Sequence, residues 1–318
     1  MSQMNPAATR VVDPILSQHA RGYRQAGLVG EILFPRAPVP QYGGNVIEFG
    51  KEAFRLYNSR RAPGASTKRI SFGYAGKPYT ITPSALEASV PRELMRDASQ
   101  VPGIDLAARA VNTVSRAMRL EHEYNCAQIA RNTANYDGTH RVALVGADRW
   151  TGATSNPSED VEAGKEAIRT AIGVTPNVAV VSAAAMSALR FNPQILDRIK
   201  HTGRDTPTAD LLASLWGIRR VVVGEAVVAT GSNDTLGDVW GQDVILAYAA
   251  ESTGDVNANA EEPSYGYTYF IDGHPLVEQP YWDNSTKSWV YGVSDDNSPV
   301  LSGMVAGYLI QNAGAAAA

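Results

Sequence analysis

One helical stretch carries the residue types of a metal site. His122 and Cys126 lie four residues apart in HEYNC, with Glu123 between them. In a helix this spacing places both side chains on one face, as in the helical zinc motif whose glutamate acts as a base. That motif has a second histidine where this sequence has cysteine, and His122 also falls on the apolar face of the predicted helix. We therefore interpret His122 and Cys126 as buried or interface residues rather than as metal ligands.

The signatures of other catalytic sites are missing from the sequence. It contains no G-x-S-x-G elbow, no phosphate-loop pattern and no G-x-G-x-x-G after a predicted strand. Acidic residues cluster at 159–162 and at 255–262, where charge at a helix N-terminus and a solvated loop explain them without carboxylate catalysis. The sequence predicts no catalytic residue, no cofactor site and no metal site, and hence a protein that is not an enzyme.

A basic segment near the start of the chain calls for an explanation. The stretch NSRRAPGASTKRISF, residues 58–72, holds four cations and no acid: Arg60, Arg61, Lys68 and Arg69. Its proline, glycine, serine and threonine residues favour turns, and alternating strand patterns flank it. A long hairpin is expected, with its basic tip serving as a solvated loop, a phosphate clamp, a nucleic-acid contact or an ionic contact with acidic patches of a neighbouring subunit.

The composition of the chain bears on which of these roles the basic segment can have. The 318 residues are 44% hydrophobic and 19% charged, with a net charge of −4, so the chain can bury a substantial core and lacks the basic balance typical of nucleic-acid binding. A single cysteine fits a reducing compartment. The sequence shows no signal-peptide pattern at its start and no run of ~18 apolar residues. We expect a protein made in the cytosol that needs no membrane.

The elements around these residues differ along the chain. Residues 1–45 are rich in proline and glycine, which predicts an extended arm. The arm holds scattered apolar residues that are expected to lie on another surface, among them Ile15, Leu16, Leu28 and Phe34. Residues 102–135 show apolar positions at steps of three and four, which predicts a helix of about 30 residues. An α/β region follows, with a buried strand at NVAVVS. The last part is strand-rich and aromatic, and its NAGAAAA end is expected to fray.

This order of elements resembles the HK97-type major capsid proteins of tailed bacteriophages. Two local stretches carry the resemblance: NVAVVSAAAMSALRFNPQILDRIK, a strand running into a helix and a loop, and LLASLWGIRRVVVGEAV, a short helix, W-G and an apolar strand. In the second stretch Arg219 replaces the proline that the family has after W-G. The resemblance implies an α+β fold with five parts: an N-terminal arm at 1–45, an E-loop hairpin at 46–91, a P-domain with its spine helix at 92–152, an A-domain at 153–254, and return strands of the P-domain with a C-terminal tail at 255–318.

The resemblance also implies a function and partners. The chain is expected to self-assemble into pentamers and hexamers that form the icosahedral head shell of a virion, assembled in the host cytoplasm and enclosing double-stranded DNA without sequence-specific binding. The four cations of the E-loop and the four apolar residues of the arm are the expected contacts between subunits. Separate scaffolding, portal and possible decoration proteins are expected as partners, and closure without covalent cross-links through Lys68 or Lys77.

Three other interpretations stay open at this point. An encapsulin-like compartment shell has the same subunit fold and differs in its contents. An α/β enzyme with an unrecognised site predicts a monomer or small oligomer. A tail or baseplate protein of a phage is less compatible with a long helix followed by an α/β region.

Overall fold

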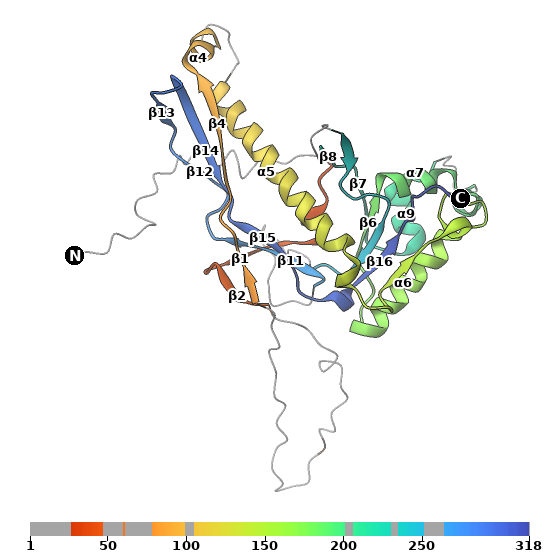
Figure 1. Cartoon of the computed structure of the whole chain (residues 1–318). Helices are drawn as coiled ribbons and strands as arrows, with labels where there is room; N and C mark the ends of the chain where they lie inside the picture. Colours follow the sequence, from red (N-terminus) through yellow and green to blue (C-terminus); the bar gives the residue numbers. More distant parts are fainter. Residues whose placement is uncertain are drawn as a thin grey trace.

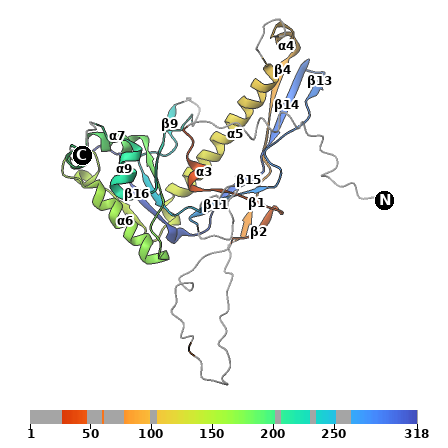
Figure 2. The ribbon, with the colours of Figure 1, turned by 180° about the vertical axis from the view of Figure 1, so that it is seen from behind.

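The computed structural model describes residues 27–46, 60, 78–98, 105–200, 206–229, 235–250 and 264–317. Figure 1 shows a narrow lobe with the long helix α5 and a sheet, and a broader α/β lobe that contains the C-terminus; Figure 2 shows the same arrangement from behind. The predicted contact residues Ile15, Leu16, Arg61, Lys68 and Arg69 lie outside the described residues.

Helix α5 (Leu106–Arg131) links the two lobes. The Asp105 carboxylate accepts hydrogen bonds from the backbone N–H groups of Ala107 and Ala108 and so caps its N-terminus. The helix has 26 residues and spans about 39 Å. It is slightly shorter than predicted because it begins after the Asp105 cap and ends before Asn132, whose side chain caps a 3-10 turn.

The sheet of the narrow lobe packs against the first half of α5. It comprises β4 (Ala85–Pro91), β14 (Ser288–Ser294), β13 (Tyr281–Asp283) and β12 (Leu276–Val277), and β4 leads into α4 (Arg92–Ala98). Val90, Tyr291 and Val293 are buried against apolar residues of the helix: Val111, Val114 and Met118. This apolar cluster explains why the end of the predicted hairpin and the predicted return strands meet in one sheet.

A second sheet lies where the lobes join. Its strands are β1 (Arg36–Val39), β11 (Gly266–Ile271) and β15 (Asn297–Leu301), and helix α3 (Gly30–Leu33) precedes β1. β1 runs parallel to β11, so residues from the predicted arm form part of the chain's own sheet. Beside it, β2 (Gly43–Asn45) pairs with β3 (Pro78–Thr80).

The α/β lobe is built on a five-stranded sheet of order β5–β16–β10–β6–β7. Its strands are β5 (Arg141–Ala143), β16 (Gly307–Gln311), β10 (Val244–Ala247), β6 (Val178–Ser182) and β7 (Arg220–Gly224). The helices are α6 (Pro157–Ile172), α7 (Ala183–Phe191), α8 (Pro193–Ile199) and α9 (Ala209–Trp216). Strands β8 (Val227–Ala229) and β9 (Leu236–Asp238) pair as a separate hairpin. Short 3-10 turns lie at Thr133–Asn135, Gly146–Asp148 and Met304–Ala306. All five residues of β6 are buried, as its apolar sequence predicts.

The far end of the chain differs from the prediction. β16 lies inside the α/β sheet, between β5 and β10. The residues after it do not fray, because Ala313 and Ala315 are buried and the Thr151 hydroxyl donates a hydrogen bond to the Ala315 carbonyl. The predicted frayed tail is therefore wrong for residues up to 317.

Mixed helices and sheets confirm the α+β class. Within the described part of the chain, none of the helices combines the length and the apolar character that a membrane span requires.

Candidate assembly surfaces

The pairing of β2 with β3 fixes the base of a loop. Asn45 is the register partner of Pro78, and the Ile81 N–H donates to the Tyr42 carbonyl at 2.7 Å. The chain therefore leaves this site after residue 45 and returns to it at residue 78. The predicted basic residues lie in that interval, and Arg60, the one of them that the structure describes, is exposed.

Two neighbouring acids hold this base onto the chain's own sheet. Asp296 is 1% exposed, and its carboxylate accepts hydrogen bonds from the Tyr42 hydroxyl at 2.8 Å and the Ser84 N–H at 3.2 Å. The Asp295 carboxylate accepts from the Arg36 guanidinium at 3.0 Å. Tyr42 and Ser84, which flank the paired strands β2 and β3, are thus tied to the segment after β14. Sequence reasoning missed both aspartates, because their partners lie more than 200 residues away in the chain.

Glu123, the acid of the suspected metal motif, serves as a structural junction. Its side chain accepts hydrogen bonds from the Val29 N–H at 2.9 Å, the Gly30 N–H at 2.7 Å and the Trp240 indole N–H at 2.7 Å. These donors belong to the segment that enters α3 and to the α/β lobe. The carboxylate is 1% exposed, and the cost of burying its charge raises its pKa despite the three hydrogen bonds.

The His122 ring and the Cys126 sulfur lie beside each other, with Sγ 3.6 Å from Nε2. The His122 Nε2 lies 3.0 Å from the Thr268 hydroxyl, and burial, followed by the charge of Arg36, lowers the pKa of the imidazole to about 4. Cys126 is fully buried, and burial raises the pKa of its thiol well above the usual value. Among the residues that the structure describes, no group of three or more potential ligands could hold a metal ion. Cys126 lies in the protein interior and His122 is half-buried beside it, and the thiol is held in its unreactive neutral form.

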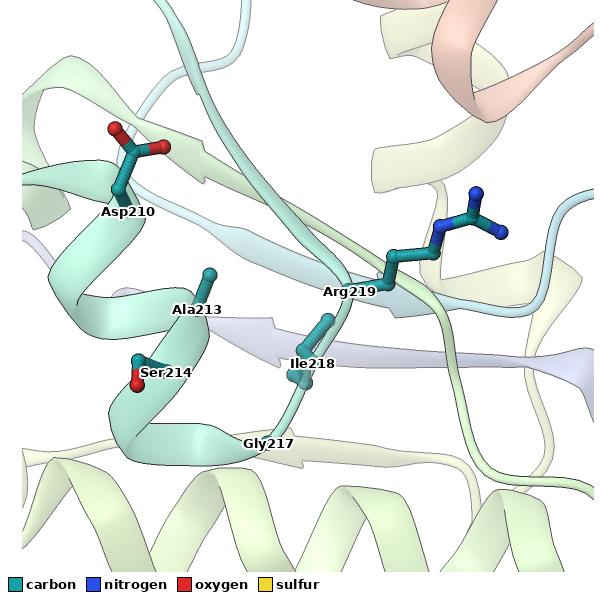
Figure 3. A pocket seen from close by; sticks show the side chains of 6 residues that line it. All are labelled: Asp210, Ala213, Ser214, Gly217, Ile218 and Arg219. Carbon is teal, nitrogen blue, oxygen red and sulfur yellow. The ribbon is translucent and has the colours of Figure 1, made fainter.

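The α/β lobe carries a surface hollow of about 480 Å³ between the end of α9 and the start of β7 (Figure 3). Asp210 and Arg219 extend from α9 and from the strand entry respectively, with Ala213, Ser214, Gly217 and Ile218 completing the lining. This lining contains neither histidine nor cysteine. The lining mixes apolar side chains with one carboxylate, one hydroxyl and one guanidinium.

Large apolar side chains are exposed on both lobes. Phe191 at the end of α7 is 78% exposed, and Leu94 on α4 is also exposed. Further exposed apolar or aromatic residues are Leu86, Val145, Leu236, Tyr281 and Trp289. Single exposed apolar residues are common, but their presence at the ends of both lobes is compatible with contacts between copies.

The two described residues of the predicted arm contact lie in different surroundings. Leu28 is half-buried. Phe34 is 0% exposed, and its ring lies 5.4 Å from that of Tyr265 within the same chain. The predicted contact between subunits at Phe34 is therefore wrong, because its side chain is enclosed by the core of its own chain.

Comparison with known structures defines the class of this fold. The capsid of cyanophage P-SCSP1u superposes with a TM-score of 0.56 at 11% sequence identity, covering 97% of this chain and 92% of that chain. A phage-related protein from Bordetella bronchiseptica RB50, known from a crystal structure, has a TM-score of 0.85 and 60% identity, covering 98% of this chain and all of that chain. The fold is that of the HK97-type capsid proteins.

Sequence comparison identifies the family. Residues 98–264 match the family described as phage major capsid protein E. The major capsid protein of Burkholderia phage BcepMu is 35% identical over 301 residues, which cover 95% of this chain and 96% of that protein. This chain belongs to the phage major capsid protein E family.

Proposed function

We propose that the chain assembles into pentamers and hexamers that close into the icosahedral head shell of a phage and enclose double-stranded DNA. Its role is structural rather than catalytic. The observation that best supports this proposal is the anchored base at β2 and β3, which holds the ends of a basic 32-residue interval, residues 46–77, at one point of the subunit. A loop fixed in this way can rest on a neighbouring copy while its own subunit stays rigid.

The contacts between subunits follow from the same arrangement. Arg60, Arg61, Lys68 and Arg69 meet acidic surface of the next copy, and Ile15, Leu16 and Leu28 belong to the arm that reaches a neighbour. A surface ion pair contributes about 0–1 kcal/mol, so each contact is weak and misplaced subunits can dissociate. Many copies of such a contact together stabilise a closed shell.

The remaining partners are proposed on the resemblance. Scaffolding, portal and possible decoration proteins are separate chains, assembly takes place in the host cytoplasm, and the mature shell closes without covalent cross-links. The net charge of −4 suits a container that does not hold DNA phosphates tightly.

Expression of the chain alone and with the neighbouring genes of its phage tests this function. Sedimentation and electron microscopy of the heavy fraction are expected to reveal closed polyhedral shells or free pentamers and hexamers. DNA in shells produced by infection separates a virus from a compartment loaded with an enzyme. A stable monomer at high concentration, with and without the partner genes, refutes the proposal.

A further inference from the structure

The strand β4 forms a long open edge of the narrow lobe's sheet. Within the described part of the chain β14 alone pairs with it, and β14 and β13 follow on one side of it in both views (Figures 1 and 2). Four of its seven residues are exposed. Edge strands are usually shortened or interrupted to prevent pairing with other chains. Pro38 in β1 and Pro299 in β15 interrupt the edges of the second sheet, whereas β4 has a proline only at its last position.

The hydrogen bonds at both ends of β4 show which backbone groups are unused by β14. The Arg92 N–H donates to the Lys287 carbonyl at 3.1 Å, and the Asp295 N–H donates to the Ser84 carbonyl at 3.0 Å. Hydrogen-bonded pairs alternate along an antiparallel ladder, so the even-numbered residues of β4 bond to β14. The backbone groups directed away from the sheet belong to Ala85, Glu87, Ser89 and Pro91. The last of these lacks an N–H, as expected where no ladder bond is made.

The side chains at this edge favour a partner strand with a basic centre. The odd-numbered residues face away from α5, and the small side chains of Ala85 and Ser89 leave the central Glu87 prominent. Glu87 accepts a hydrogen bond from the Tyr281 hydroxyl at 3.1 Å. The Glu278 carboxylate lies close by, since both glutamate side chains come within 3.6 Å of the point where a Cβ on Gly292 would stand. This part of the edge is therefore negatively charged.

We propose that residues 7–13 of a second copy, AATRVVD, add to β4 as a further strand with Arg10 opposite Glu87. The segment has seven residues between Pro6 and Pro14, the same length as β4. Its threonine and two valines favour strands, and an Arg–Glu pair across two strands is stabilising. The proposal rests on the proposed function, because it requires assembly, and it specifies one contact of that assembly.

A second copy is the occupant that repeated contacts require. Every copy carries both the segment and the open edge, and two different patches on one chain build rings when the rotation between copies closes. The 14 residues from Asp13 to Gly27 span up to about 45 Å when extended. This reach exceeds the length of helix α5, about 39 Å.

Disulfide trapping in the full chain tests the pairing, because the one native cysteine, Cys126, is fully buried. Arg10→Cys and Glu87→Cys are placed in separate chains, which are mixed, assembled under reducing conditions and then oxidised. Opposed hydrogen-bonded residues have Cα atoms about 5.5 Å apart, within disulfide range. We expect a covalent dimer on a non-reducing gel. Leu86→Cys replaces Glu87→Cys as the control, because that side chain lies on the opposite face of the sheet, and it is expected to give no dimer.

Further variants keep the test decisive. If the Arg10 variant does not assemble, Ser89→Cys is combined with Ala8→Cys for an antiparallel strand and with Val12→Cys for a parallel one. Ser89→Pro removes an N–H that β14 does not use, and we expect it to reduce shell yield at least tenfold relative to Ser89→Ala. Shells that form without any cross-link, or a link found only within one chain, overturn the pairing while leaving the proposed function intact. Failure of the unmodified chain to assemble counts against both proposals.

Discussion

Glu123 offers the sharpest test of how the chain holds its two lobes together. Its carboxylate is the shared acceptor for three donors from two distant parts of the sequence: the Val29 N–H, the Gly30 N–H and the Trp240 indole N–H. Glu123→Ala removes the acceptor and leaves the donors in a buried site. Each unsatisfied buried donor costs about 1–3 kcal/mol. Truncation also removes the cost of burying the carboxylate, and water can enter the vacated space. We therefore expect the free energy of unfolding to fall by about 3–5 kcal/mol, towards the low end of the summed range.

The control lies two residues away on the same helix. Glu121 is exposed, so Glu121→Ala is expected to change the free energy of unfolding by less than about 0.5 kcal/mol. Glu123→Gln keeps one acceptor oxygen and directs an amide NH₂ at the remaining donors, and it is expected to fall between the two alanine variants.

Urea unfolding of dissociated subunits, followed by tryptophan fluorescence, measures these differences. Hydrogen exchange at the Val29 and Gly30 amides measures the same junction locally, and a loss of about 3 kcal/mol corresponds to roughly a hundredfold faster exchange. If Glu123→Ala is within 0.5 kcal/mol of Glu121→Ala, the three hydrogen bonds do not hold the junction and the reasoning fails.

Three other outcomes follow from single sites. In the folded chain the pKa of His122 is lowered from its ordinary 6.5 to about 4. The contribution of the neutral imidazole to stability is therefore complete above pH 6.5 and is lost as the pH falls towards 4. Between pH 7 and pH 4, we expect the urea midpoint of His122→Gln to fall less steeply than that of the unmodified chain. Gly30→Ala should destabilise the fold by about 1–3 kcal/mol, since its Cβ would stand 2.7 Å from the Glu123 carboxylate. Gly27→Ala is the control, because its Cβ would meet no neighbour although Gly27 has a positive φ. Thermal unfolding of both variants separates the effect of crowding from that of backbone strain. Asp296→Ala should cost about 2–4 kcal/mol and speed hydrogen exchange at the Ser84 amide, and unchanged exchange there contradicts the proposed anchoring of the loop base.

Elements governed by local sequence could be predicted well. β6 follows from the apolar run NVAVVS and is buried throughout. The start of helix α6 was expected from the acidic residues of its first turn, and the helix begins at Pro157 after Asn156. Gly217 ends α9 with a φ of 63°, a backbone conformation that glycine adopts without strain. In each case the signal lies within a few residues of the element that it specifies.

The second half of α5 could not be predicted from its pattern. The apolar spacing placed His122 on the buried face, whereas the structure leaves His122 half-buried and buries Glu123, Cys126 and Ala130. The first half of the helix packs on the β4–β14 sheet and the second half on α3 and the α/β lobe. A helix that changes partners along its length changes its buried face as well, and hydropathy does not specify where that change occurs.

This change of partners explains why a carboxylate lies at the junction. The two halves of α5 belong to separate apolar clusters, and apolar packing is non-directional, so it tolerates small rotations of one lobe about the helix. Three hydrogen bonds converging on Glu123 require fixed directions from α3 and from Trp240. The buried charge is costly, as its raised pKa indicates, and the benefit is a defined angle between the lobes. In a shell, where every copy must present its loop and its open strand edge in the same orientation, that angle determines whether successive subunits meet.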